Sequence, residues 1–157
     1  TGHGFNGSGL VGEGGGQVVH ILQECSVPVL FVPDEEIGLG SLVVGYDGSI
    51  AAARGVGCIR RVFEGRPLPV HAVFVGESSD GGDVLAEVDE DLPGFEVHHH
   101  VISGAVVHEA LGTEAQRLGA DILVLGFRER TGLRGFLLGT ASDYLLARAR
   151  TAVLVSH

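Results

Sequence analysis

The sequence predicts an α/β fold in which a doubly wound parallel sheet carries helices on both faces. Short apolar runs rich in strand formers alternate with longer segments whose apolar residues recur at helical spacing. The sequence has 26 glycines, many of them between these segments, where tight turns require them. Strands that alternate with helices over short loops form right-handed βαβ units, and such units build a parallel sheet.

Residues 1–37 are predicted to be a helix–strand remnant of a preceding repeat, followed by a linker. Residues 1–16 are dense in glycine, residues 17–25 carry apolar side chains at helical spacing, and Val29–Val32 reads as a short strand. Glycines, a helix, a turn and a strand recur in this order in residues 139–157, which favours an internal repeat. A coincidence between two glycine-rich stretches is the alternative.

Residues 38–157 are predicted to form one domain. Its strands are short apolar runs bounded by glycine, proline or polar residues, and its first helix begins at Ser49, a plausible N-cap. The segment 77–94 is acidic and glycine-rich with weak periodicity, so we expect it to be shortened or loosely structured. In chain order, the expected strands are 41–45, 69–75, 96–102, 121–126 and 152–155, and the expected helices are 49–64, 105–118 and 141–150.

The stretch from Asp121 to Ser142 carries the strongest functional signal. Its apolar run ends at Gly126, and a loop with three arginines and two further glycines follows. Gly139 and Thr140 then lead into a helical segment. A strand, a glycine-bearing loop and a helix start, in this order, bind phosphate, because glycines admit an anion to the backbone and the helix start offers unpaired N–H groups.

The spacing of this stretch resembles a family signature. Gly126, two residues, Glu129, nine residues and then Gly139-Thr140 is similar to the G-x2-G-x9-G-[ST] pattern of the universal stress protein family. The predicted strand at 121–126 resembles the fourth strand of that family, and the predicted strand at 152–155 resembles the fifth. The chain departs from the pattern at Glu129, where nucleotide-binding members carry a glycine, and a carboxylate there would repel phosphate oxygens. The resemblance implies a five-stranded, Rossmann-like sheet with strand order 3-2-1-4-5.

The resemblance also implies a ligand site. In that strand order the strands ending at Gly45 and Gly126 are neighbours, and ligands bind beyond the carboxyl ends of strands at such a switch point. The implied ligand is ATP, with Mg²⁺ held through its phosphates. Asp47 would contact the adenosine, although a turn and capping role explains it equally well. The implied binding residues are Asp47, Gly126, Arg128, Gly139, Thr140, Ala141 and Ser142.

Some of these residues have a simpler interpretation as well. Arg128, together with Arg130 and Arg134, either binds phosphates through its forked donors or forms surface ion pairs with Glu129 or the acidic segment 77–96. Thr140 caps the last helix, and it donates to a phosphate only when a ligand is present.

The two terminal apolar segments predict how the domain associates. Val27–Val32 and Ala152–His157 are short and rich in β-branched residues, and an open sheet edge of this kind must be covered or paired. In the resembled family, fifth strands pair antiparallel across a two-fold or pseudo-two-fold axis. We therefore expect the two segments to meet, within one chain or between two, with a sister repeat or a second copy as the partner.

Composition excludes several function classes. The formal net charge of −10 disfavours a nucleic-acid backbone as partner, and no apolar run is long enough to span a bilayer. Cys25 and Cys58 lack metal-type spacing and read as small buried thiols. His98 and His100 should share one face of a strand and His99 the other, with nothing in the pattern to complete a metal site.

The sequence contains no nucleophile elbow, no HExxH motif and no P-loop. The expected function is therefore that of a non-catalytic, cytoplasmic stress-response protein with an ATP-binding crevice. One alternative is a nucleotide-free dimerisation or regulatory module of the same fold, which the departure at Glu129 favours. A slow ATP hydrolase is the third candidate.

Overall fold

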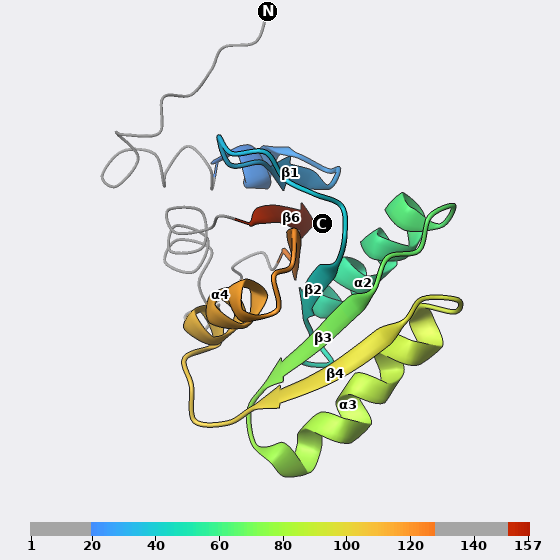
Figure 1. Cartoon of the computed structure of the whole chain (residues 1–157), viewed down its shortest axis with the longest axis vertical. Coiled ribbons are helices and arrows are strands. Elements are labelled where there is room, and N and C mark those ends of the chain that lie inside the picture. The colour runs from blue at the N-terminus through green and yellow to red at the C-terminus, as the bar shows by residue number, and fades with distance from the viewer. Residues whose placement is uncertain (1–19, 128–150) are drawn as a thin grey trace, which may run out of the picture.

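The computed structural model describes residues 20–127 and 151–157, which form a mostly parallel sheet with helices on both faces (Figure 1). Residues 20–24 are helical and precede the first strand. The strands are β1 (Val29–Phe31), β2 (Leu42–Gly45), β3 (Val70–Val75), β4 (Val97–Ile102), β5 (Ile122–Gly126) and β6 (Ala152–Ser156). The helices are α2 (Ile50–Phe63), α3 (Ser78–Asp91) and α4 (Val107–Arg117).

The six strands lie in the order β1-β6-β5-β2-β3-β4. The five strands of residues 38–157 are mutually parallel and have the predicted order 3-2-1-4-5. The sheet has one strand more than the five expected, because β1 adds antiparallel to β6 with Val29 opposite Val155 and Phe31 opposite Val153. This pairing, within one chain, is the contact that the sequence predicts for the two apolar terminal segments.

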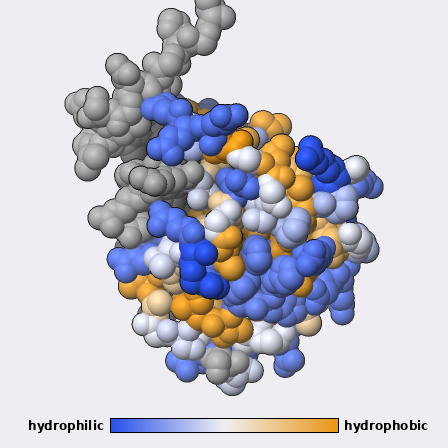
Figure 2. All heavy atoms as spheres, in the orientation of Figure 1, coloured by the Kyte–Doolittle hydropathy of each residue, from blue (hydrophilic) through white to orange (hydrophobic). Residues whose placement is uncertain are grey.

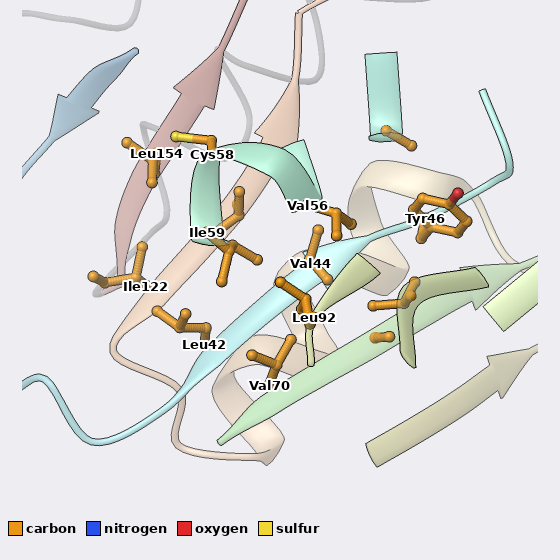
Figure 3. Packing of buried hydrophobic residues seen from close by; sticks show 14 of the residues in the cluster. Leu42, Val44, Tyr46, Val56, Cys58, Ile59, Val70, Leu92, Ile122 and Leu154 are labelled. Atoms are coloured by element: carbon orange, nitrogen blue, oxygen red, sulfur yellow. The ribbon is translucent and has the colours of Figure 1, made fainter. Parts of the chain in front are cut away.

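The larger core lies between the sheet and the helices α2 and α3. Figure 3 shows Val56, Cys58 and Ile59 of α2 directed at side chains of the neighbouring strands. Every one of these three side chains is fully buried. Burial raises the pKa of the Cys58 thiol, which keeps it neutral and agrees with its predicted role as a small hydrophobe.

Two smaller clusters cover the opposite face. Leu111 and Ala115 of α4 pack on Val43, Val73 and Leu123 of the sheet. A separate group joins the helical residues 20–24 to β6 and consists of Leu22, Phe127, Val153 and Val155. The N-terminal helix and strand are thus packed on the edge of the domain, and β6 has a paired strand on each side.

The expectation of a loosely structured segment at 77–94 is wrong, because α3 is a regular helix of 14 residues. Its first turns contain serine, aspartate and two glycines, which are weak helix formers. Leu85, Val88 and Leu92 nevertheless lie on one face and are buried against the sheet. Tertiary packing of this face compensates for the low intrinsic helix propensity of the segment.

The acidic residues of α3 contribute to a hydrophilic surface. Figure 2 shows hydrophilic side chains gathered over the β4 and α3 side of the molecule. Within residues 20–127 and 151–157, no helix is long and apolar enough to cross a membrane.

Asp121 fixes the linker that precedes β2. Its Oδ2 accepts hydrogen bonds from the backbone N–H groups of Gly40, at 2.6 Å, and Ser41, at 3.2 Å. A Cβ atom at Gly38 would lie 2.9 Å from Oδ1 of the same carboxylate, so the linker passes close to the start of β5. This contact orients the chain as it leaves β1 and enters the domain.

Candidate functional site

The candidate site lies where β2 and β5 run side by side. The two strands are parallel neighbours, with Leu42 opposite Ile122 and Val44 opposite Val124. The chain leaves β2 toward β3 on one side, whereas β5 continues toward β6 on the other side. The carboxyl ends of the two strands therefore form a topological switch point, which is where open α/β sheets bind ligands.

The turn after β2 is built by its own side chains. Oδ1 of Asp47 accepts a hydrogen bond from the Ser49 N–H at 3.0 Å, and Gly48 adopts a positive φ of 75°. The Ser49 hydroxyl oxygen accepts from the Ala52 N–H at 3.2 Å and caps α2. The turn and capping roles predicted for Asp47 and Ser49 are thus confirmed, and the Asp47 carboxylate lies at the edge of the switch point.

The first turn of α2 sits against the end of β5. A Cβ atom at Gly126 would overlap the carbonyl oxygen of Ala51 and lie 2.9 Å from the Ala52 backbone nitrogen. The first turn of α2 carries no acidic side chain of its own, and the acidic group beside the helix start is Asp47, which accepts from the N–H of the N-cap Ser49. The turn after β2, the start of α2 and Gly126 consequently converge on one place.

Tyr46 closes the side of the site that faces α3. Its ring is buried, and its hydroxyl donates a hydrogen bond of 2.7 Å to Oε2 of Glu87. Burial and the Glu87 carboxylate raise the pKa of the Tyr46 phenol above its ordinary value, so Tyr46 remains a neutral donor. Sequence reasoning missed this pair, because no local pattern links two residues 41 positions apart.

The structure tests only part of the predicted residue set. It places Asp47 and Gly126 beside the start of α2, as described above. The remaining predicted residues, and Glu129 with them, lie outside the described residues: Arg128, Gly139, Thr140, Ala141 and Ser142.

A second polar cluster lies on β3 and β4, beneath α4. Nδ1 of His71 and Nε2 of His100 are 3.0 Å apart, and Nδ1 of His100 lies 3.4 Å from Oε1 of Glu114. Nε of Arg117 donates to Glu114 at 2.9 Å, and the His98 ring stacks on His71 with centroids 5.1 Å apart. We call these five residues the histidine cluster.

The predicted alternation along β4 is confirmed. His98 and His100 face the α4 side, whereas His99 contacts Asp89 of α3 at 3.0 Å on the other face. Sequence reasoning missed that His71 joins them, because the register His71↔His98 of β3 on β4 cannot be read from either strand alone. Over the part of the chain that the structure describes, no group of three or more histidine, cysteine or acidic side chains is arranged to hold a metal ion.

Burial controls the ionisation of this cluster. It lowers the pKa of His71, where His100 and His98 act in the same direction, and it lowers the pKa of His100 despite the nearby Glu114 carboxylate. The hydrogen bond from Arg117 holds the pKa of Glu114 below its ordinary value. Neutral imidazoles therefore face an ion pair between Glu114 and Arg117.

The strand order and the switch-point geometry define a doubly wound, Rossmann-like α/β protein. Residues 76–157 match the model of the universal stress protein family, and the chain belongs to that family. The resemblance drawn from the spacing around Gly126 is therefore confirmed at the level of the family.

Solved structures show the same relationship. A universal stress protein from Archaeoglobus fulgidus superposes with a TM-score of 0.72 at 25% identity; the match covers 87% of this chain but only 51% of that protein, so the chain spans about half its length. A universal stress protein solved in complex with cAMP has a TM-score of 0.63 at 25% identity, over 75% of this chain and 96% of that protein. A relative from Lactobacillus plantarum shares the fold at 14% identity, with a TM-score of 0.63 over 78% of this chain and 100% of that protein. No curated protein matches the sequence.

Proposed function

We propose that this chain is a non-catalytic, cytoplasmic stress-response protein that binds an adenine nucleotide at the switch point between β2 and β5. One observation carries the proposal: the Asp47 turn and Gly126 meet at the start of α2. Such a helix start favours negative charge. A structural neighbour in complex with cAMP, at 25% identity, supports a nucleotide as the ligand class.

The proposed contacts divide between two ends of the nucleotide. Asp47 accepts from the adenosine, because its carboxylate lies at the exposed turn after β2. Backbone amides around Gly126 and Gly139 hold the phosphates, and Mg²⁺ is held through the phosphates alone. Arg128 and the start of the helix that the sequence predicts for residues 141–150, at Thr140, Ala141 and Ser142, supply the remaining donors.

One observation favours a second candidate function. Glu129 occupies the position where the family signature has a glycine, and its carboxylate would repel phosphate oxygens. A nucleotide-free regulatory module of the same fold is the function that this residue supports.

Calorimetric titration with ATP and Mg²⁺, and separately with cAMP, tests the first candidate against the second. We expect binding of at least one nucleotide, and we expect Gly139→Asp to weaken it by about 100-fold, because like charges brought together cost several kcal/mol. Gly82→Asp is the matched control, since it adds the same charge in open space on α3. No heat with either nucleotide would favour the nucleotide-free module. Binding with equal affinity in the two variants would show that the nucleotide does not contact the loop at Gly139 and would contradict the proposed site.

We further propose that residues 20–33 end a preceding repeat and take the place of a partner subunit. Their helix and strand have the same order as the helix and strand that the sequence predicts for residues 139–157, and β1 pairs antiparallel with β6. The match to the Archaeoglobus fulgidus protein, in which the chain covers 87% of its own length but about half of the relative, agrees with a tandem arrangement.

Removal of residues 1–33 tests this association. The intact chain should not dimerise through β6, because both edges of that strand are already paired. The shortened chain exposes one edge of β6 together with Val153 and Val155, and we expect it to dimerise, since unpaired apolar edges recruit other strands. Light scattering after size-exclusion chromatography measures both masses. A shortened chain that stays monomeric and folded would contradict the proposal.

A further inference from the structure

A pocket distinct from the switch point lies at the other side of β5, between the N-terminal segment and the main domain. Its volume is about 500 Å³, within the range of small-molecule sites. Four parts of the chain that are distant in sequence form its wall: the end of the N-terminal helix, α2, the residue after β5 and the residue after β6. The lining residues are Gln23, Glu24, Cys25, Ser26, Arg54, Phe127 and His157.

Two polar side chains of the pocket, Arg54 and His157, have donor groups that find no partner among the described residues. Within residues 20–127 and 151–157, the Arg54 side chain makes no hydrogen bond or ion pair. Nε2 of His157 is buried and has no hydrogen-bond partner among the described residues. A buried nitrogen without a partner costs free energy, and a guanidinium offers five donors in a fixed fork, so both groups favour a ligand that accepts hydrogen bonds.

The remaining walls specify more of the ligand. Phe127 is buried, and its ring lies against the His157 ring with centroids 4.6 Å apart. This aromatic pair offers an apolar surface, whereas Gln23 and Ser26 offer further donors. Glu24 is the one acidic group among the lining residues, and it can accept from a hydroxyl of the ligand.

We propose that this pocket binds a small organic anion, whose carboxylate or phosphate is held by Arg54 and His157 and whose flat apolar part packs on Phe127. Asp47 and the turn after β2 do not line this pocket, whereas Phe127, which does, directly follows Gly126 of the proposed nucleotide crevice. The wall of the pocket combines the N-terminal helix with α2 and the residues after β5 and β6, so an occupant ties the N-terminal segment to the domain.

Phenyl phosphate and benzoate are the probes, since each joins a flat ring to one anionic group. Titrations followed by amide NMR shifts should show saturable changes at Cys25, Arg54 and His157. The probe that saturates at the lower concentration identifies phosphate or carboxylate as the preferred group. Benzyl alcohol, which has the ring without the charge, should bind about tenfold more weakly or not at all, because charge-assisted hydrogen bonds to arginine are lost.

Variants test the two named residues. Arg54→Gln should weaken binding by about tenfold or more, whereas Arg60→Gln removes the same charge elsewhere on α2 and should leave it unchanged. His157→Phe keeps a ring beside Phe127 and should also weaken binding. Equal affinity of Arg54→Gln and the parent chain, equal binding of benzyl alcohol, or no saturable shift with either anion would overturn the proposal. Displacement of the probe by ATP would place it in the nucleotide crevice and would overturn the proposal as well.

Discussion

Replacement of Gly126 by alanine is expected to lower the free energy of unfolding by about 3 kcal/mol, at the upper end of what overpacking costs. The added Cβ would overlap the carbonyl oxygen of Ala51 and crowd the backbone nitrogen of Ala52. Both are backbone atoms, so no flexible side chain can move aside. The first turn of α2 would have to shift away from the end of β5, and the turn held by Asp47 and Ser49 would shift with it.

Urea unfolding of the variant and the parent chain measures this loss. Gly57→Ala is the matched control. Gly57 lies in α2, the helix that packs against Gly126, and a Cβ atom at Gly57 would meet no atom within 4 Å. That control should stabilise the protein by about 0.5–1 kcal/mol, since alanine has the higher helix propensity. An unfolding midpoint for Gly126→Ala equal to that of the parent would show that α2 and β5 are not in such close contact.

The stability of Gly126→Ala would show whether Gly126 is required for packing, apart from any role in phosphate binding. The sequence pattern attributes Gly126 to phosphate binding, because glycines let an anion approach the backbone. The structure gives a packing reason that applies without any ligand, and Gly126 does not have a positive φ. A glycine in a binding motif can therefore be required by the fold first, and its mutation alone is poor evidence for a ligand site.

The fold was largely predictable because its signals are local. Short apolar runs mark β2 and β5, and helical spacing marks α2 and α4 within two residues of their observed ends. The segment of α3 was misjudged, because its first turns are poor in helix formers and its burial depends on contacts with the sheet. Local patterns carry no information about such distant contacts.

Site residues were predictable from the sequence only where they belong to a local sequence motif. Asp47 and Gly126 follow two apolar runs that the strand order brings together. Arg54 and His157 meet Cys25 only through the packing of three segments, and no spacing in the sequence relates them. The same is true of His71 and Glu114, which approach His100 from a neighbouring strand and from a helix.

The histidine cluster should make the protein lose stability in mild acid. The unfolded chain binds protons at histidine near pH 6.5, whereas burial lowers the pKa of His71 and His100 in the folded state. Below about pH 6.5 the unfolded state therefore binds more protons, and the free energy of unfolding falls as pH falls. The slope is at most about 1.4 kcal/mol per pH unit for each histidine, and it levels off below the lowered pKa values.

The groups around these two imidazoles set the limits of this effect. His98 adds repulsion once it is protonated, although Glu96 lies 2.9 Å from its Nε2. Arg117 opposes further positive charge, whereas the Glu114 carboxylate favours it. Because the pKa of Glu114 is itself lowered, its stabilising ion pair persists above about pH 4.5 and is lost only in stronger acid. The two transitions should therefore be separated on the pH axis.

Urea unfolding between about pH 8 and pH 5 measures the histidine contribution. The double variant His71→Gln with His100→Gln should give a clearly flatter profile, because glutamine keeps hydrogen-bonding groups but binds no proton in this range. His20→Gln is the control, since His20 lies in the N-terminal helical residues and outside the histidine cluster. A parent profile that is already flat, or a double variant as steep as the parent, would show that these imidazoles accept protons freely while the protein is folded.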